Sequence, residues 1–518
     1  MNILFLEKKY IYPLVIFLFS ISVNQYYGYI GILPIDSFLI FNSGYDLLNG
    51  FYPFKDYWTI KEPFIDLLQA LFFKVLGVSW FSYVLHASIF NFIISISTYS
   101  ILRYFKLSAN LSFLYAFCVA ALTYPTAGTP FSDHHTLIFC ILSLYLFFIT
   151  IKTNNKFFWF LIPFLIVFSF LSKQAPTAYM ILVISFLSLI FFFYKKDFSG
   201  LIFSTIGLLI FIFLFIITLF LLNIEFIDFI NQYFLFPKSL GATRLDWVFP
   251  LEFKRIVLRF KIHYFSIFFL VFILIRCTIK NKKKIKIEEV LIALSLIFTC
   301  LFFIFHQLMT INAIFIYCLI PIFLAFSHIY CKNFYDKKPI KILLISSLLV
   351  SSTYYFVKYV HSRTFMDLKS VDISKAIDAG KIDKKLSGIK WITMFYPEKP
   401  SEEIKNINFA VKILKKDTGK KMIVTDYQFI SVFLNEYDYA VTRFWYDFHG
   451  YPSKDNKFFS YWKNFVIEKI KENKITNIYV LKPLHGDNNP LENIFGHCLE
   501  KKIFSTTFYK IDLRRCNI

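Results

Sequence analysis

Two aspartates, Asp36 and Asp133, stand where a polar stretch of the chain meets a long apolar one. A carboxylate at such a boundary can accept the proton of a hydroxyl group as that hydroxyl attacks an anomeric carbon. Each also precedes a stretch with helical periodicity, where aspartate is common because it caps the helix. Both are candidate catalytic residues, and on the residues alone helix capping is an equal alternative.

Four cations near similar boundaries suit the binding of a phosphate group. Lys61 stands in a Lys-Glu-Pro segment, and Lys173 ends an apolar stretch. Arg255 and Arg259 are four residues apart, so a helix would project both from one face, where two guanidinium groups suit a phosphate. The alternatives are lysines that reach from a membrane span to water, and arginines attracted to anionic lipid headgroups.

Other polar residues in these stretches are given supporting roles. Asp56 and Glu62 are predicted partners of the cations, and Arg244 and Lys254 are predicted to help hold the phosphate. Guanidinium and ammonium groups near one another would offset the charge that a phosphate gains when it leaves.

Two histidines follow Asp133 and raise the question of a metal ion. Adjacent residues cannot both face one site on a helix, so His134 and His135 are interpreted as interfacial residues. A divalent metal held by Asp133 with His134 stays as an alternative, and no cofactor is assigned.

The composition is that of a polytopic membrane protein. The chain has 518 residues, 57% hydrophobic and 69 of them Phe, with a mean hydropathy of +0.57. Soluble domains do not need so many large apolar residues, and here they form long runs. The net charge of +22 is interpreted as the cation excess of cytoplasmic loops, not as a nucleic-acid surface. The cysteines in or beside the apolar runs are predicted to be packing residues: Cys118, Cys140, Cys277, Cys300, Cys318 and Cys331.

Hydropathy predicts about eleven membrane spans in a helical bundle. They are Tyr10–Tyr27, Phe81–Tyr104, Ala109–Tyr124, Thr136–Thr150, Phe157–Leu171, Ala175–Tyr194, Leu201–Leu222, Tyr264–Ile279, Val290–Phe305, Ile311–Ile329 and Ile342–Val357.

Cations in the connections predict the orientation of these spans. Arg103 with Lys106, Lys195 with Lys196, and the run 280–286 all fall on one side of this arrangement. That side is predicted to be cytoplasmic, with the N-terminus inside and the C-terminus outside. Residues 31–80 and 223–263 are then long outer loops of a transmembrane domain that covers residues 1–361.

The first outer loop is predicted to contain two amphipathic helices at the membrane surface. A helical wheel of Asp36–Asn49 places Asn42, Ser43 and Asp46 on a polar side opposite an apolar one. Leu39 is the exception, because it is apolar and does not fall on the apolar side. In Phe64–Gly77, polar residues share one face above an apolar underside. Helices of this kind lie in the plane of the interface.

From about residue 362 the long apolar runs stop and charges increase. Residues 386–393, 420–430 and 474–484 are predicted as short buried strands, and 401–417 and 455–474 as amphipathic helices. This alternation predicts a small extracytoplasmic α/β domain, residues 362–518, with a largely parallel sheet. Cys498 and Cys516 flank a predicted strand, and the sequence does not decide whether they form a disulfide or stay as two free thiols.

The first loop resembles that of the polytopic glycosyltransferases of the C superfamily, most closely the family 39 branch of protein mannosyltransferases and aminoarabinose transferases. The resemblance rests on short motifs: Asp36 after the first span; Gly50, Pro53, Phe54, Asp56 and Tyr57; Lys61, Glu62, Pro63 and Phe64; and Lys173 with Gln174. Two residues depart from the pattern. Ser37 replaces a second acid, and Glu62 replaces the first proline of a Lys-Pro-Pro unit.

The resemblance implies an inverting glycosyltransferase of the bacterial inner membrane with its C-terminal domain in the periplasm. It would transfer a sugar from a polyprenyl-phosphate donor to a glycan, lipid or protein acceptor, with Asp36 as base and no nucleic-acid partner. A secondary transporter or lipid flippase is an alternative, but it predicts ionisable residues in mid-membrane. An O-antigen ligase or polymerase is a further alternative, which the first loop matches less well.

Overall fold

The computed structural model describes residues 8–246, 248–249, 252–280, 285–446, 450–484, 490–498, 500–514 and 516. The chain divides into two compact units, each assembled from three segments. We call them the helical unit (Met1–Gly28, Val84–Phe215 and Arg244–Phe365) and the α/β unit (Tyr29–Tyr83, Ile216–Thr243 and Met366–Ile518). The first outer loop therefore groups with the C-terminal residues, although the sequence analysis placed it with the membrane spans.

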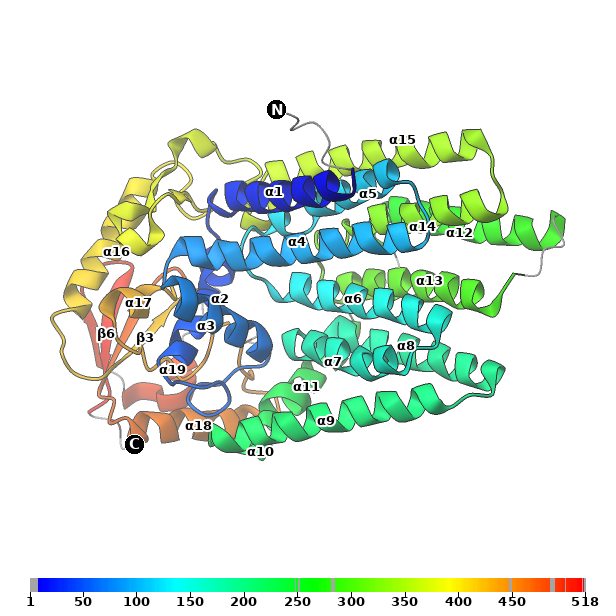
Figure 1. Cartoon of the computed structure of the whole chain (residues 1–518). Coiled ribbons are helices and arrows are strands. Elements are labelled where there is room, and N and C mark those ends of the chain that lie inside the picture. The colour runs from blue at the N-terminus through cyan, green and yellow to red at the C-terminus, as the bar shows by residue number, and fades with distance from the viewer. Residues whose placement is uncertain are drawn as a thin grey trace, which may run out of the picture. The chain divides into compact units, whose positions relative to one another are not determined.

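Long apolar helices make up the helical unit (Figure 1). They are α1 (Lys8–Gly28), α4 (Trp80–Tyr104), α5 (Ala109–Leu122), α6 (Ser132–Thr153), α7 (Lys156–Ser172), α8 (Gln174–Lys195), α9 (Ser199–Leu221), α12 (Lys261–Lys280), α13 (Ile287–Met309), α14 (Leu319–Phe334) and α15 (Lys338–Tyr355). Each predicted span overlaps one of them, although α14 begins eight residues later than predicted. Within the described residues, six helices are long and apolar enough to cross a membrane. The protein is thus mainly helical, with the elements of a membrane protein.

A two-residue turn brings the predicted site residues of α6 and α7 to the same end of the unit. Asn154 adopts a left-handed conformation with φ 50°, which asparagine tolerates, and Asn155 caps α7 by accepting a hydrogen bond from the N–H of Phe157 at 2.9 Å. The two helices pack against each other (Figure 1). Because they run in opposite directions, the start of α6 lies beside the end of α7.

Hydrogen bonds and a close approach between two glycines fix the connection that precedes α6. The buried Arg363 donates hydrogen bonds to the carbonyl oxygens of Pro125 at 3.0 Å and Ala127 at 3.1 Å. Gly128 has φ 82°, and a Cβ there would lie 2.6 Å from the Cα of Gly28, so only glycine fits. This connection leads directly into Asp133.

The cations that predicted a cytoplasmic side gather at the opposite helix ends. Lys152 pairs with Glu289, and Lys195 Nζ lies 2.7 Å from Glu288 Oε1. Lys332 donates a hydrogen bond to the carbonyl oxygen of Lys106 at 2.7 Å. One end of the described helical unit therefore collects several of the predicted cytoplasmic loops.

Reporter fusions test which side of the membrane this end faces. A fusion after Lys196 is expected to be active only with a cytoplasmic reporter, and a fusion after Asp367 only with a periplasmic one, because cations near spans resist translocation. The reversed pattern would place Asp36 in the cytoplasm and would rule out chemistry on the outer face.

The α/β unit contains a four-stranded sheet in the order β3-β4-β6-β5. β3 (Lys421–Thr425) and β4 (Asn477–Leu481) are parallel, whereas β6 (Phe508–Asp512) runs antiparallel to both β4 and β5 (Glu500–Ile503). The predicted largely parallel sheet is therefore wrong, since only one pair is parallel. The hairpin of β5 and β6 was missed because β5 is a lysine-rich, exposed edge strand without a buried apolar pattern.

Helices and a second, small sheet complete the α/β unit. The helices are α2 (Pro34–Leu48), α3 (Pro63–Leu76), α10 (Phe226–Phe229), α11 (Phe236–Leu245, ending in the helical unit), α16 (Pro400–Leu414), α17 (Ile430–Leu434), α18 (Phe459–Glu472) and α19 (Pro490–Phe495), and β1 (Ile377–Asp378) pairs with β2 (Lys390–Trp391). Trp58 of the first loop lies in the same core as Trp462 and Val424. The loop is therefore built into the domain.

The two amphipathic helices of the first loop differ in what covers them. In α3, Asp66 and Gln69 are buried while Leu67, Leu71 and Val75 are exposed, so the polar face points into the protein. In α2, both sides are buried, and Leu39 packs with Ile35 and Phe444 on the side predicted to be polar. The polar side of α2 is therefore covered by protein, and this packing explains why Leu39 is the exception on the helical wheel.

The cysteines separate into two groups. Cys498 and Cys516 form a disulfide, which settles the question that their spacing left open. Cys118, Cys140, Cys300, Cys318 and Cys331 are buried free thiols, as predicted, while the side chain of Cys277 lies outside the described residues.

Candidate functional site

Asp133 and Lys173 meet at one end of the helical unit. Lys173 Nζ lies 2.6 Å from Asp133 Oδ2, and both side chains are largely buried. Asp133 lies in the first turn of α6, one residue after Ser132, whereas Lys173 has an extended backbone between α7 and α8. The two residues stand 40 positions apart in the sequence, and the structure brings them together as an ion pair.

Two more ionisable groups act on this pair. Arg244 is largely buried, and burial lowers the pKa of its guanidinium, while the negative charge of Asp133 opposes that effect. His306, near the end of α13, interacts electrostatically with Lys173, Asp133 and Arg244. The local arrangement is one carboxylate among two cations and an imidazole, which is suited to holding an anionic group next to a general acid or base.

Arg255 lies in a π-helical turn, Lys254–Leu258, and Arg259 is the residue that follows this turn. Arg255 Nη2 donates a hydrogen bond to the carbonyl oxygen of Leu308 at 2.9 Å, two residues beyond His306, and Lys254 is exposed. A guanidinium has five N–H donors, so this bond leaves Arg255 with others for a ligand.

Conservative exchange tests the predicted phosphate role of these arginines. Arg255→Lys with Arg259→Lys is expected to weaken binding of a polyprenyl-phosphate donor about as much as the double alanine variant, because a lysine cannot form the forked bidentate contact. Donor titration of the purified protein measures this effect. Wild-type affinity in the lysine variant would mean that net charge alone suffices.

The histidines beside Asp133 face different aromatic neighbours. The His134 ring stacks on Tyr124 with the ring centres 4.8 Å apart, while His135 Nε2 lies 3.0 Å from His86 Nε2 and its other ring nitrogen contacts Tyr124. Among the described residues, no group of three or more His, Cys, Asp or Glu side chains is arranged to hold a metal ion.

Asp36 lies in the first turn of α2 and is half-buried. The residue before the helix is Leu33, whose N–H donates to Ser37 Oγ at 3.0 Å. Asp36 is thus not the cap residue, which weakens the capping alternative, although a negative charge in a first turn is itself favourable.

Lys61, Glu62 and Asp66 belong to a buried ion network in the α/β unit. Lys61 Nζ lies 3.1 Å from Glu62 Oε1 and 5.5 Å from the centre of the Phe444 ring. Arg443 Nη2 donates to Glu62 at 3.0 Å and to Asp66 at 2.6 Å, and its Nη1 also contacts Asp66. Glu62 is therefore a partner of cations, as predicted, whereas Asp56 accepts the N–H of Tyr52 at 2.6 Å and closes its own turn.

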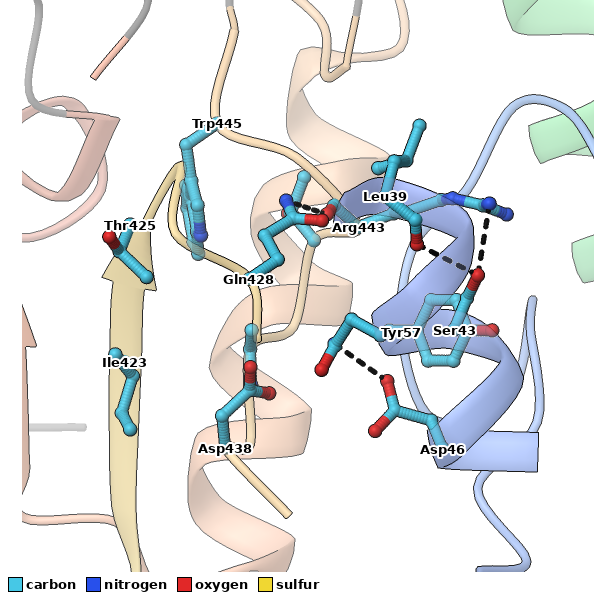
Figure 2. Close-up of a pocket in the computed structure, with 13 residues that line it drawn as sticks. Leu39, Ser43, Asp46, Tyr57, Ile423, Thr425, Gln428, Asp438, Arg443 and Trp445 are labelled. Atoms are coloured by element: carbon cyan, nitrogen blue, oxygen red, sulfur yellow. Dashed lines mark hydrogen bonds between the residues drawn. The ribbon is translucent and has the colours of Figure 1, made fainter. Parts of the chain in front are cut away.

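A small buried pocket lies beside this network. Its walls include Tyr57, Asp46 of α2 and Asp438 of the coil beside β3, with Arg443 and Gln428 nearby (Figure 2). The enclosed volume is about 10 Å³, room for about one water molecule. Burial raises the pKa of both carboxyl groups, to about 6 for Asp438, and the charge of Asp438 raises that of Asp46 further.

These carboxyl groups predict a pH dependence of stability. A carboxyl whose pKa is raised from 3.8 to about 6 by folding stabilises the fold least above pH 6 and most below pH 4. Asp438→Asn is expected to raise the stability by roughly 2 to 3 kcal/mol at pH 7.5 and to change it little at pH 4, since asparagine can still accept the N–H of Ala440. Melting temperatures at both pH values measure this difference.

Asp372→Asn provides the control, because Asp372 is exposed and hydrogen bonding lowers its pKa. A stability gain in Asp438→Asn that is equal at both pH values would contradict the assignment.

No protein-family model matches the chain, and no curated protein matches its sequence. The assignment of the candidate site residues therefore rests on their geometry in the structure. The helical unit holds Asp133, Lys173, Arg244, Arg255 and Arg259, and the α/β unit holds Asp36, Asp56, Lys61 and Glu62. Arg443, Asp438 and Arg363 were missed from the sequence, because each stands near other polar residues and carries no local signal of its role.

Proposed function

We propose that this protein is an inverting glycosyltransferase that moves a sugar from a polyprenyl-phosphate donor to an acceptor on the outer face of a bacterial inner membrane. The observation that carries the proposal is the Asp133–Lys173 pair with Arg244 beside it at one end of the helical unit. A carboxylate among cations at the end of membrane helices suits a substrate whose phosphate lies at the lipid headgroups.

The reaction would be a single displacement. The acceptor oxygen forms a bond to the anomeric carbon as the bond from that carbon to the phosphate oxygen breaks, and this inverts the configuration. Asp36 takes the proton of the acceptor hydroxyl. The leaving polyprenyl phosphate gains one negative charge, which Lys173 and Arg244, with Arg255 and Arg259, offset.

Two further features support this location and chemistry. The disulfide between Cys498 and Cys516 fits an oxidising compartment, as the periplasm is. The ion pairs of the described helical unit lie at helix ends, Asp133–Lys173 at one end and Lys195–Glu288 at the other. This distribution favours surface chemistry over the mid-membrane charges expected of a transporter.

Lipid analysis of a deletion strain tests the proposal. A polyprenyl-phosphate sugar is expected to accumulate when the protein is absent, and its headgroup identifies the donated sugar. Unchanged lipid pools together with the loss of a transported solute would instead support the transporter.

A further inference from the structure

The α/β unit has a second cavity, larger and more open than the buried pocket. It lies at the end of α2, between residues 45–51, 418–420 and 435–439, and its volume is about 500 Å³. Cavities of roughly 300 to 1,000 Å³ are typical of sites for small ligands. We call it the aromatic cavity because of its lining.

Aromatic rings from two distant parts of the chain form its wall. The rings of Phe51 and Tyr437 are parallel, with centres 3.7 Å apart and planes at 7°, and Tyr439 lies 5.0 Å from Tyr437. Tyr45 completes the set. All four are partly exposed. Flat, partly exposed rings of this kind offer an apolar face to the C–H groups of a sugar ring, while tyrosine hydroxyls can bond to its hydroxyl groups.

Amide side chains supply hydrogen bonds at the rim. Asn49 donates to the carbonyl oxygen of Tyr45 at 2.8 Å, and Asn435 accepts from Lys385 at 3.1 Å. Each amide uses one of its two polar groups in this way and keeps the other, and both side chains are exposed. Amides that can donate or accept suit a ligand with many hydroxyl groups.

The charged side chains around the cavity carry both signs, and some of them already contact other side chains. Glu436 pairs with Lys421 at 2.7 Å, and Lys420 lies over the Tyr439 ring at 5.4 Å from its centre. A site for a phosphate or nucleotide would need an excess of cations. The balance here favours an uncharged ligand.

We propose that the aromatic cavity binds an uncharged sugar residue. A second step rests on the proposed transferase function. We infer that this sugar is part of the acceptor, so that the acceptor is a glycan and not a lipid or a protein.

Binding of a labelled glycan panel to the full-length protein in lipid nanodiscs tests the site. The panel holds neutral trisaccharides of mannose, glucose, galactose and N-acetylglucosamine, with a sulfated trisaccharide and an unglycosylated peptide beside them. We expect at least one neutral glycan to bind, and Thr418→Trp, which fills the cavity, and Phe51→Leu, which removes a flat face, to weaken binding by about tenfold or more. Lys416→Trp is the matched control, because it adds the same side chain at an exposed position outside the cavity lining.

The proposal is overturned if no neutral glycan binds, if both cavity variants bind like the control, or if the peptide or the sulfated glycan is preferred. Glycan binding without any transfer from polyprenyl-phosphate donors would refute the transferase and leave the site standing. Transfer with an unchanged acceptor KM in Thr418→Trp would refute the site and leave the transferase standing.

Discussion

Replacing Asp36 with asparagine is expected to slow sugar transfer by about two to four orders of magnitude, because it removes the proposed general base. The folded protein should persist, because asparagine has nearly the size of aspartate and its side-chain oxygen can still accept a hydrogen bond. Single-turnover transfer from a saturating polyprenyl-phosphate donor measures the chemical step.

The control for this experiment is Asp372→Asn, an equal change of charge at an exposed position of the same unit. Near-normal transfer by Asp36→Asn would show that Asp36 contributes only to the helix. Asp133→Asn should also be damaging, because Lys173 then loses its partner. A complete loss at Asp133 with a mild effect at Asp36 would exchange their proposed roles.

Replacing Arg443 with methionine is expected to destabilise the α/β unit by about 3 to 5 kcal/mol, because it leaves the charges of Glu62 and Asp66 buried without their partner. The side chains of all three residues are at most 2% exposed. Burial lowers the pKa of Arg443, but the charges of Asp66 and Glu62 outweigh that effect and raise it, so the guanidinium stays charged. The loss of stability is measured as the decrease in the urea concentration at which the full-length protein becomes susceptible to a protease.

A triple variant separates the unpaired charge from the lost packing. Arg443→Met combined with Glu62→Gln and Asp66→Asn should recover much of the stability, since no carboxylate is then left unpaired. Arg514→Met is the control, because Arg514 pairs with Asp512 at an exposed position, where an ion pair contributes little to stability. Equal stability of Arg443→Met and Arg514→Met would mean that the network is dispensable.

The helices follow from local sequence, and the contacts between distant residues do not. Apolar runs such as that of α6 predict their helix to within a few residues because hydropathy acts over one segment. Asp133 and Lys173 were both found as boundary charges, but their pairing depends on the packing of α6 against α7. Arg443 carries no local signal of its role, since its partners stand 377 and 381 residues away.

The strands of the sheet also differ in how well the local sequence predicts them. β3 and β4 have buried apolar patterns that predict strands, whereas β5 is exposed along its whole length. The antiparallel pairing of β6 with both β4 and β5 makes the sheet mixed. Leu39 looked misplaced on the polar side of α2 because its neighbour there, Phe444, comes from the far end of the chain.

The separation between Arg443 and the first loop has a consequence for biosynthesis. Glu62 precedes Arg443 by 381 residues, which a ribosome adding 5 to 20 residues per second needs about 20 to 75 s to complete. In the proposed topology the loop would cross the membrane during that interval, with the carboxylates of Glu62 and Asp66 and without the guanidinium group that neutralises them. The nascent loop would then wait in a hydrated or chaperoned state, and a chain truncated before residue 443 would present it to quality-control proteases.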